Sequence, residues 1–548
     1  MRFVLNQELI ELDDSQIDIN LSLLRYLREF KHLCGTKEGC ASGDCGACTV
    51  LLGHYQDDAI RSDKLTSTAQ TTPPEENDNQ ANKAIHYHSV NACILPLSAI
   101  HCRHVVTVEH LTQISATVPN TSAGEHLASL YPSQQAMVEH HASQCGFCTP
   151  GFVMSLTGLL ERRTQIKADT TTLKESVKDC IAGNLCRCTG YRPIVEAGVH
   201  MFDLAMINPP ADLANNRIVD TMKMLNTYGD SSKRTHQYWQ PVSLNEVCNI
   251  LHAQPEARII AGGTDLMLEV TQHFKTLTKI IDISRVAELK QITRPAVENA
   301  QARESKIRIG AAVTYTELLH AFSDIQTLQQ LILRIGAEQV RNRGTVGGNI
   351  ANASPIADLP PVFLALDANI EIIDGQQKKS TVNIDAFYSG YKHTVLNDTP
   401  ACIIAIEFNA DYLNDFLRFY KLSKRIEDDI SSVMTAVRFA IENNTVKDVR
   451  IAFGGMAATP IRARQSEQCF IGKSIDDEQT LQTACNALRK ELSPMSDVRA
   501  SAEYRLNMAE NLLRKAWLEL NGHHLPTINQ THFTQSSQLR TGEEQSHA

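Results

Sequence analysis

The chain is predicted to fold as several domains of the α+β class, because its length, its hydrophobic pattern and its cysteine distribution all indicate separate units. It has 548 residues, whereas a single hydrophobic core stops growing near about 250–300 residues. Strand-like runs come first, helical runs follow, and strands then alternate with helices. Eleven of the fifteen cysteines precede residue 189, so the front of the chain differs chemically from the rest. We therefore expect three or four domains.

The composition is that of a soluble globular protein, with 43% hydrophobic and 21% charged residues and a net charge of −10. No basic patch indicates a nucleic-acid partner. Polar residues interrupt the N-terminus within a few positions, and no apolar run approaches membrane length. The cysteine bias fits metal binding in a reducing compartment better than a disulfide scaffold. We expect a cytoplasmic protein that contacts neither membranes nor nucleic acid.

Residues 1–112 are predicted to form a small β-rich domain. Residues 3–5 and 49–52 are strand-like, and residues 21–27 have a helical pattern. A polar stretch from about 56 to 83 interrupts this domain. Its composition cannot bury enough apolar surface to fold alone. We expect it to be an exposed, mobile insertion.

Residues 113–205 are predicted to form a domain of four short helices with cysteines at their ends. This placement has a physical reason, because a thiolate-ligated cluster is anionic and helix N-terminal amides favour nearby negative charge. The expected helices cover residues 135–142, 150–163, 173–182 and 193–204.

The remainder is predicted to hold a linker, two further domains and a tail. Residues 206–236 are charged and unpatterned, which favours a linker. Residues 237–412 alternate strand-like and helical runs and are expected to form a mixed α/β domain. Residues 413–524 form a β-then-α segment, and the polar residues 525–548 are expected to be a disordered tail.

The first cysteine set, Cys40, Cys45 and Cys48 with a later Cys93, has the C-x4-C-x2-C…C spacing of a plant-type [2Fe–2S] ferredoxin. Sulfide-bridged iron is soft and takes thiolate ligands, and the tight loop presents three sulfurs from one turn. Glycines allow that loop to curl so that N–H groups face the sulfurs; these are Gly39, Gly43 and Gly46. The spacing predicts one [2Fe–2S] cluster.

A second set combines a C-x2-C pair with a later C-x-C pair: Cys145, Cys148, Cys186 and Cys188. By spacing alone it suits either an iron–sulfur cluster or a tetrahedral zinc site. The other cysteines are interpreted as small buried apolar residues; they are Cys34, Cys102, Cys180, Cys248, Cys402, Cys469 and Cys485.

Two glycine-rich loops are candidate nucleotide contacts. One follows an apolar strand at 261–265, and the other covers 344–350. Each alone could be an ordinary tight turn, but as a pair they could cradle a pyrophosphate with backbone N–H groups. A dinucleotide is the natural ligand for such a pair. Because the chain lacks a G-x-G step, a Rossmann fingerprint is excluded.

Three segments that contain the cysteines, residues 38–50, 144–151 and 183–192, resemble the signature segments of the molybdenum hydroxylase family. The resemblance covers nearly the whole chain, apart from the insertion before Cys93. It implies a β-grasp ferredoxin domain followed by a four-helix domain in which the second cysteine set holds another [2Fe–2S] cluster.

Segments 259–266, 345–358 and 421–430 are similar to FAD-domain loops of the xanthine dehydrogenases in that family. The resemblance implies a two-part FAD-binding domain of the PCMH type, with a C-terminal segment like that of CO dehydrogenase flavoproteins. It implies pyrophosphate and ribitol contacts from Ile259, Ile260, Ala261, Gly262, Gly263, Thr264, Asp265, Leu266, Thr345, Val346, Gly347, Gly348 and Asn349.

The same resemblance assigns further site residues. Asp358 and Lys421 would also contact the flavin, and Ile403 or Ile404 would lie near its ring. Ile335 stands where several relatives have an aromatic residue that stacks on the flavin. Tyr391, Asp428 and Asp429 resemble positions that line a nicotinamide site, and Gln144 resembles a glutamine that contacts the partner's pterin. Taken alone, the aspartates could equally form a solvated acidic turn, and Gln144 could be simply solvated.

The function that the resemblance implies is electron transfer. Electrons would pass from a molybdopterin centre through the second cluster, the first cluster and FAD to NAD⁺. The molybdopterin domain of the relatives follows their FAD segment, whereas this chain ends soon after it. We therefore expect a separate large molybdopterin subunit, two of each subunit in a heterotetramer, and no substrate-oxidising residue here.

The expected substrates are hypoxanthine and xanthine, since both cluster domains and the flavin domain are joined in one chain. The alternatives are the equivalent subunit of an aldehyde or N-heteroaromatic dehydrogenase, a stand-alone NADH-dependent iron–sulfur flavoprotein reductase, and a structural zinc protein.

Overall fold

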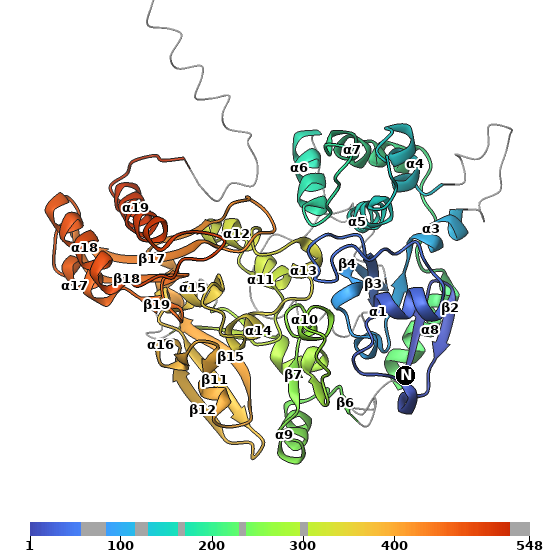
Figure 1. The fold of residues 1–548 in the computed structure, drawn as a ribbon, viewed down its shortest axis with the longest axis horizontal. Helices are drawn as coiled ribbons and strands as arrows, with labels where there is room; N and C mark the ends of the chain where they lie inside the picture. The colour runs from blue at the N-terminus through green and yellow to red at the C-terminus, as the bar shows by residue number, and fades with distance from the viewer. Residues whose placement is uncertain (56–83, 116–129, 163–169, 229–236, 296–304, 527–548) are drawn as a thin grey trace, which may run out of the picture. The chain divides into compact units, whose positions relative to one another are not determined.

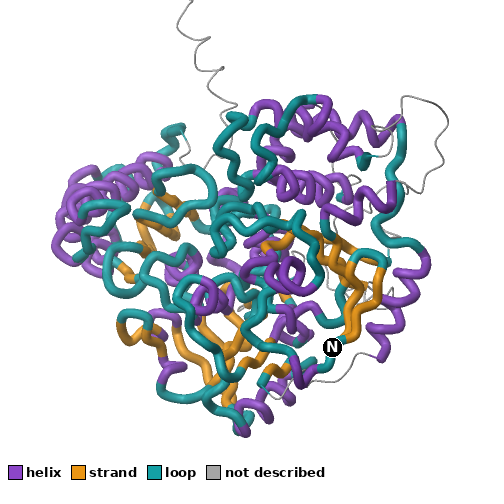
Figure 2. Tube along the Cα trace, turned by 45° about the vertical axis from the view of Figure 1, so that its right-hand side comes forward, coloured by secondary structure: helices purple, strands orange, loops and turns teal. Residues whose placement is uncertain are grey.

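The computed structural model describes residues 1–55, 84–115, 130–162, 170–228, 237–295 and 305–526 (Figure 1). The expected insertion and almost all of the expected tail lie outside these residues. The chain divides into two compact units. Both contain helices and strands, which confirms the α+β class (Figure 2). Unit 1 consists of Met1–Ala321, Gly336–Ser354 and Asp367–Tyr412, and unit 2 of Phe322–Ile335, Pro355–Leu366 and Leu413–Ala548.

Unit 1 begins with a five-stranded mixed sheet of the β-grasp type, in the order β2-β1-β5-β3-β4. β1 pairs in parallel with β5, and the other neighbours are antiparallel. The sheet is buried on both faces because alternate residues of β3 enter different cores: Val50 and Leu52 pack with the first helical segment, and Leu51 packs with the helices that follow. The elements are β1 (Arg2–Leu5), β2 (Glu8–Glu11), α1 (Leu23–Arg25), η2 (Tyr26–Phe30), β3 (Thr49–Tyr55), β4 (Ile85–Asn91), η3 (Ala92–Ile94), η4 (Leu97–Ile100) and β5 (His104–Val106).

The four helices predicted after this sheet are all present, with ends shifted by a few residues. α5 is apolar on nearly every side and buried along most of its length, so it forms the centre of the group. The four helices are α4 (Pro132–Glu139), α5 (Thr149–Glu161), α6 (Thr170–Ile181) and α7 (Arg192–Ile207), and a further helix that was not predicted, α3 (Val108–Ser115), precedes them.

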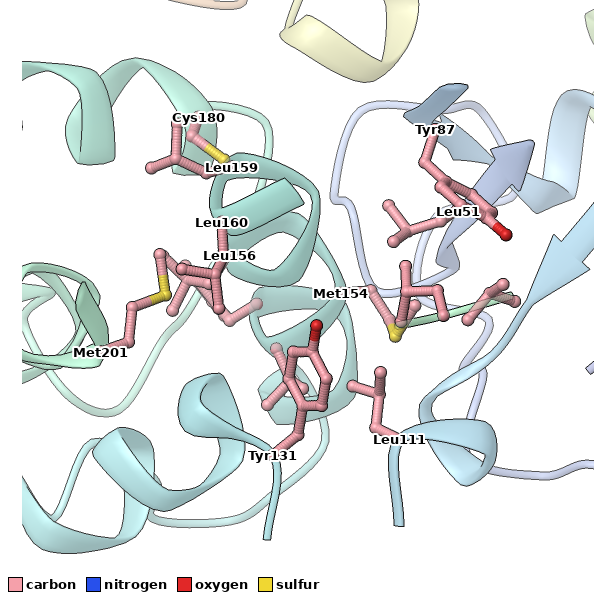
Figure 3. Packing of buried hydrophobic residues seen from close by; sticks show 14 of the residues in the cluster. Leu51, Tyr87, Leu111, Tyr131, Met154, Leu156, Leu159, Leu160, Cys180 and Met201 are labelled. Carbon is pink, nitrogen blue, oxygen red and sulfur yellow. The ribbon is translucent and has the colours of Figure 1, made fainter. Parts of the chain in front are cut away.

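One core joins the sheet to these helices. Figure 3 shows Leu51 and Tyr87 of the sheet in the same buried cluster as Met154 and Leu156 of α5. The helix of Gly158 approaches the sheet so closely that a Cβ at this glycine would lie 3.0 Å from a methyl group of Leu51. The two predicted cluster domains therefore pack as one body.

The expected linker, residues 206–236, contains a packed helix, α8 (Asn216–Tyr228). Ile218, Met222 and Leu225 are buried in the core that Leu51 also enters. These residues recur at i, i+4 and i+7, so they form a helical stripe that the surrounding polar residues obscure in the sequence. The prediction of an unpatterned run was wrong for this segment.

The rest of unit 1 is built on two more sheets. A parallel sheet has the order β6-β8-β7, and a five-stranded sheet has the order β12-β11-β15-β10-β9. The elements that place the candidate site are β6 (Tyr238–Trp239), α9 (Leu244–Ala253), β7 (Arg258–Ile260), α10 (Leu266–Thr271), β8 (Ile280–Asp282), β9 (Ile292–Thr293), β10 (Lys306–Gly310), α11 (Tyr315–Ala321), α13 (Glu338–Arg341), α14 (Val346–Ala351), β11 (Asn369–Asp374), β12 (Lys379–Asn383), α16 (Ile384–Phe387), β13 (Tyr388–Gly390), β14 (His393–Thr394) and β15 (Ala401–Asn409).

Unit 2 is an antiparallel sheet, β16-β17-β18-β19, packed with helices. It takes two segments from inside the expected domain 237–412, so that domain is not one compact unit. The reason is visible in α15, whose residues are all buried and which packs on β17 and β18. The elements are α12 (Gln326–Ile332), α15 (Leu359–Ala365), β16 (Phe416–Leu422), β17 (Val433–Glu442), β18 (Thr445–Gly454), β19 (Ile461–Arg462), α17 (Arg464–Phe470), α18 (Glu478–Glu491) and α19 (Ala502–Leu520).

Across the described ranges, no helix combines the length and the apolar character needed to span a membrane.

Candidate cysteine centres and flavin loops

The first cysteine set is brought together by the loop between η2 and β3 and by η3. Cys48 and Cys93 are buried, and Cys40 and Cys45 are partly exposed. The loop curls through left-handed backbone at Gly43 (φ +85°) and Gly46 (φ +66°), as the glycine pattern predicts.

The four thiols of this set contact one another in pairs. The Cys40 side chain hydrogen-bonds with those of Cys45 and Cys93, and the Cys93 side chain also hydrogen-bonds with that of Cys48. The backbone N–H of Ser42 donates to Cys40 Sγ over 3.4 Å. These contacts lower the pKa of the Cys40 thiol.

The second set joins the turn before α5 to the turn between α6 and α7. Cys148 is paired with Cys186, and Cys145 with Cys188. Each member of the C-x2-C pair therefore meets one member of the C-x-C pair. Cys145 and Cys188 are exposed, so this centre lies at the protein surface.

Cys186 is surrounded by hydrogen-bond donors. The amides of Cys188 and Thr189 each donate to its sulfur over 3.4 Å, and the Thr189 hydroxyl donates over 3.3 Å. Burial raises the pKa of this thiol, but the hydroxyl and the two amides outweigh that effect and lower the pKa to about 7. The site therefore favours a thiolate, which is the form that ligates metals.

The donor sets fit [2Fe–2S] clusters. In the described ranges, no group of three or more Cys, His, Asp or Glu side chains is placed to hold a single metal ion. The thiols of the second set form two pairs, those of the first set contact one another in the series Cys45, Cys40, Cys93 and Cys48, and a two-iron cluster takes four protein thiolates. Amides directed at the sulfurs are the outer contacts that such clusters use.

The two cysteine loops touch directly. Leu185 N–H, next to Cys186, donates to the Cys45 carbonyl over 3.0 Å. Backbones meet here without intervening side chains: a Cβ at Gly46 would lie 2.4 Å from the Gly183 carbonyl oxygen, and one at Gly151 would lie 2.3 Å from the Gly46 carbonyl oxygen. The glycines thus permit the close approach of the two centres.

The two glycine-rich loops also lie together. A Cβ at Gly262 would fall 1.9 Å from the Arg343 carbonyl oxygen, and Arg343 Nε donates to the Gly262 carbonyl over 3.2 Å. Gly263 has a left-handed φ of +81°. Thr345 caps α14 by accepting from Gly348 N–H over 3.1 Å. The structure therefore brings together the two segments that the sequence paired.

Polar groups that could bind a ligand remain at these loops. Among the described residues, the amides of Gly263, Thr264 and Asp265 have no protein acceptor. Asn349 Oδ1 is buried and likewise has no hydrogen-bond partner in the described chain. Three consecutive free amides, one of them at a positive φ, form an anion-binding concavity. The residues present therefore fit the pyrophosphate of a flavin dinucleotide.

The first cysteine set is adjacent to the first glycine-rich loop. Gln272, which ends α10, donates through Nε2 to the Cys40 carbonyl over 3.0 Å. A Cβ at Gly263 would lie 3.3 Å from the carbonyl oxygen of Ile94, the residue after Cys93. The first cysteine set and the first glycine-rich loop are therefore in direct contact.

Other predicted residues of unit 1 are spread over several elements. Ile259 and Ile260 end β7, and Leu266 begins α10. Ile403 and Ile404 are both buried in β15, at a register shift in the pairing of β11 with β15, and Ile404 packs in the core with α9. The remaining loop members, Ala261, Val346 and Gly347, lie within the two glycine-rich segments.

The predicted nicotinamide and pterin contacts of unit 1 are both exposed. Tyr391 is 60% exposed beyond β13, and Gln144 is exposed directly before Cys145. Both are accessible to a molecule that approaches from outside.

In unit 2, Asp358 and Lys421 form a buried ion pair. Lys421 Nζ lies 2.6 Å from Asp358 Oδ2, and the Ser431 hydroxyl donates to the other carboxylate oxygen. Ile335 is 7% exposed and follows α12. The Asp358 carboxylate and the Lys421 ammonium group, both predicted flavin contacts, therefore have protein partners.

Asp428 and Asp429 form a tight turn in unit 2. Asp428 has a left-handed φ of +46°. Asp429 accepts from the amides of Arg425 over 2.8 Å and Ile430 over 2.9 Å. The buried Arg334 fixes the same segment, because its guanidinium donates to the carbonyls of Lys421 and Ile426 and to the Ser423 hydroxyl.

Sequence reasoning missed three residues that organise these sites: Asn184, Gln339 and Arg343. Asn184 Nδ2 donates to the Gly46 carbonyl over 3.1 Å. Asn184 lies within the signature segment 183–192, although no role was predicted for its side chain. No motif or spacing marks Gln339 or Arg343, and their only signal is that they lie just before the second glycine-rich loop.

Four family models match the chain in sequence order. They are described as "2Fe-2S iron-sulfur cluster binding domain" over residues 10–97, "[2Fe-2S] binding domain" over 117–198, "FAD binding domain in molybdopterin dehydrogenase" over 233–408 and "CO dehydrogenase flavoprotein C-terminal domain" over 418–520. Both cluster domains and the flavin domain that the sequence predicts are confirmed by these matches.

Curated relatives include xanthine dehydrogenase of Drosophila subobscura, 28% identical over 93% of this chain and 38% of its own length. Xanthine dehydrogenase/oxidase of Gallus gallus is 27% identical over 94% of this chain and 39% of its own length. This chain thus spans about two fifths of the relatives that it matches. A carbon monoxide dehydrogenase structure from Hydrogenophaga pseudoflava is 28% identical, with a TM-score of 0.47, over 52% of this chain and 96% of its own. From the order of its four matched domains, the chain is a [2Fe–2S]/FAD member of the molybdenum hydroxylase family.

Proposed function

We propose that this chain is the electron-transfer part of an NAD⁺-dependent xanthine dehydrogenase. It would receive electrons from hypoxanthine or xanthine oxidised at a molybdopterin subunit and deliver them to NAD⁺. The expected assembly is a heterotetramer of two such chains and two large subunits, and the expected location is the cytoplasm. The xanthine dehydrogenases among the curated relatives support the choice of substrate.

The observation that carries the proposal is the position of the first cysteine loop. It touches the second cysteine loop through Leu185 N–H and the Cys45 carbonyl, and it touches the flavin segment through Gln272 and the Cys40 carbonyl. This supports the order in which the second set precedes the first set and the flavin loops come last. The exposed Cys145 and Cys188 suit entry from a partner, with Gln144 as its pterin contact.

The chain's own residues would hold each group. Cys40, Cys45, Cys48 and Cys93 would ligate one cluster, and Cys145, Cys148, Cys186 and Cys188 the other. The amides of 263–265 and the Asn349 side chain would bind the FAD pyrophosphate and ribitol. Bound FAD would supply the exchange between one-electron and two-electron transfer.

Four further assignments belong to the same proposal. Asp358 and Lys421 would orient the flavin, and Ile403 or Ile404 would lie near its ring. Ile335 would replace aromatic stacking with an aliphatic contact. Tyr391 and the Asp428–Asp429 turn would line the nicotinamide site.

The first experiment is composition of the purified chain. We expect about four iron atoms, as much acid-labile sulfide, and one FAD per chain, with a visible iron–sulfur spectrum. Bound zinc with no visible absorption would contradict the cluster assignment.

The second experiment is coexpression with a candidate molybdopterin subunit. We expect a stable complex that forms urate in a reaction dependent on NAD⁺. Oxidation of aldehydes or N-heteroaromatic acids alone would defeat the purine assignment, and a lone chain active as an NADH–dye reductase without such a partner would favour a stand-alone reductase.

A further inference from the structure

Gln339 is a buried side chain at the point where three segments of unit 1 meet. It lies on α13, just before the second glycine-rich loop, and is 1% exposed. Its Nε2 lies 3.0 Å from Ser155 Oγ, 3.1 Å from Asn184 Oδ1 and 3.4 Å from Thr49 Oγ1. One amide group of the flavin segment thus contacts polar groups of both cysteine-bearing domains.

Each of these partners is close to a cysteine in the sequence. Thr49 follows Cys48, Asn184 lies two positions before Cys186, and Ser155 lies on α5, which begins directly after Cys148. The partners also bind one another: Ser155 Oγ donates to Asn184 Oδ1 over 2.7 Å, and Asn184 Nδ2 lies 3.5 Å from Thr49 Oγ1. Gln339 therefore completes a buried polar network that links the two cysteine loops.

α13 is itself held to both domains by the residue before Gln339. Glu338 forms an ion pair with Arg162 at 2.7 Å and accepts from Ser89 Oγ over 3.1 Å. Asn342 Nδ2 also donates to the Ser89 carbonyl over 2.9 Å. Because these contacts place the backbone, the Gln339 side chain has a fixed origin from which to reach the network.

A glycine makes room for this side chain. A Cβ at Gly183 would lie 2.2 Å from Ala337 Cβ and 2.5 Å from Gln339 Oε1. Gly183 immediately precedes Asn184, and its carbonyl packs on Gly46. The space that Gly183 leaves for Gln339 is therefore next to the hydrogen bond between Leu185 and Cys45.

We propose that Gln339 is a positioning residue that sets the separation of the two cysteine centres by holding Thr49, Ser155 and Asn184 together from the flavin segment. This rests on the proposed function, because it requires both centres to hold clusters. The magnetic interaction and the rate of electron transfer between two centres both fall steeply with their separation. Loss of the Gln339 amide therefore affects the step between the clusters and leaves the step at Gln272 and Cys40 unchanged.

The test uses the full chain, purified with its iron and FAD, and the variant Gln339→Met, which has similar length and no amide. The two clusters are reduced with dithionite, and their dipolar interaction is measured by low-temperature EPR. In rapid freeze-quench experiments with NADH, we expect reduction of the second cluster to slow by up to about 100-fold, the loss that a misplacement of about 1 Å can cause, while the first cluster keeps the wild-type rate.

Gln240→Met is the matched control. Gln240 is also 1% exposed and donates through Nε2 to Asp282 over 3.0 Å, and it directly follows β6 of the parallel sheet rather than lying in a cysteine-bearing segment. We expect it to lower the thermal midpoint without changing the dipolar interaction. If Gln339→Met changes that interaction no more than Gln240→Met does, Gln339 is only a stability residue and the inference is wrong.

A milder variant covers the case in which Gln339→Met does not accumulate. Ser155→Ala removes one of the three partners of the Gln339 amide, and we expect the dipolar interaction to change, by less than the loss of the whole amide would change it. An unchanged interaction in this variant would overturn the inference. A wild-type chain without iron–sulfur signals would defeat the proposed function, whereas a loaded wild type with unaffected variants defeats only the role of Gln339.

Discussion

Lys421 Nζ lies 2.6 Å from Asp358 Oδ2, and the two side chains are only 2% and 8% exposed. A charge in such a place is tolerated because its partner is present, and removal of either side chain takes away the opposite charge that compensates for burial. We expect Asp358→Ala to lower the unfolding free energy by about 3–5 kcal/mol, measured by denaturant titration. The double variant Asp358→Ala/Lys421→Met should recover much of this loss.

FAD content separates the two roles of this ion pair. If the pair orients the flavin, the double variant regains stability and still loses FAD. Full FAD retention in the double variant would contradict the flavin contact. Glu442→Gln serves as control, since it breaks an exposed ion pair with Lys447 and should change neither property.

Gly262→Ala is expected to disturb the flavin loops, because the new Cβ would meet the Arg343 carbonyl oxygen at 1.9 Å. The two loops must separate to admit it, with a loss of about 1–3 kcal/mol in unfolding free energy. The ratio of flavin absorbance to protein after gel filtration should fall. Gly390→Ala, where the Cβ has its nearest neighbour at 3.9 Å, should keep full FAD; equal retention in both variants would sink the assignment.

Cys186→Ser is expected to abolish one cluster. Serine cannot replace a thiolate toward soft iron, so iron and sulfide should fall by about half. Cys180→Ser is the matched control, because Cys180 is buried six positions away and its thiol donates to the Ser155 carbonyl. A normal iron content in Cys186→Ser, or an equal loss in Cys180→Ser, would refute the ligand set.

His104 is expected to make stability pH-dependent. Burial is the main cause that lowers its pKa to about 3; the Asn6 carbonyl opposes this and His110 adds to it. The neutral ring fits its partners, with Nε2 donating to the Asn6 carbonyl and Nδ1 accepting from Tyr87. Since the unfolded ring binds its proton near pH 6.5, the stabilisation is complete above that pH and is lost progressively as the pH falls towards 3.

The corresponding measurement is the denaturant midpoint between pH 8 and pH 5. His104→Gln keeps one donor and one acceptor but cannot titrate. Below about pH 6, the wild type should lose up to about 1.4 kcal/mol per pH unit more than this variant. The exposed His252→Gln should retain the wild-type slope. Parallel curves for wild type and His104→Gln would show that the ring does not carry the effect.

The parts of this protein that could be predicted from the sequence are those that depend on residues close together in the chain. The cysteine spacings and the glycine-rich loops can be recognised in the sequence because cluster ligation and phosphate binding need several thiols or amides within one turn. α8 escaped because its apolar stripe lies in a polar run and is recognised only by its burial beside Leu51. The assignment of α15 to unit 2 and the contacts of Gln339 depend on residues far apart in sequence, which no local pattern records.

The glycines between the two cysteine domains also constrain protein engineering. At Gly46 and Gly151 the main chains of the sheet domain and the helical domain are in direct contact. No substitution by a smaller side chain can therefore make room there for a domain from another protein. A domain graft that exchanges either half must therefore carry the matching bare backbone with it. For recombination between homologues, the two halves behave as a single exchangeable module.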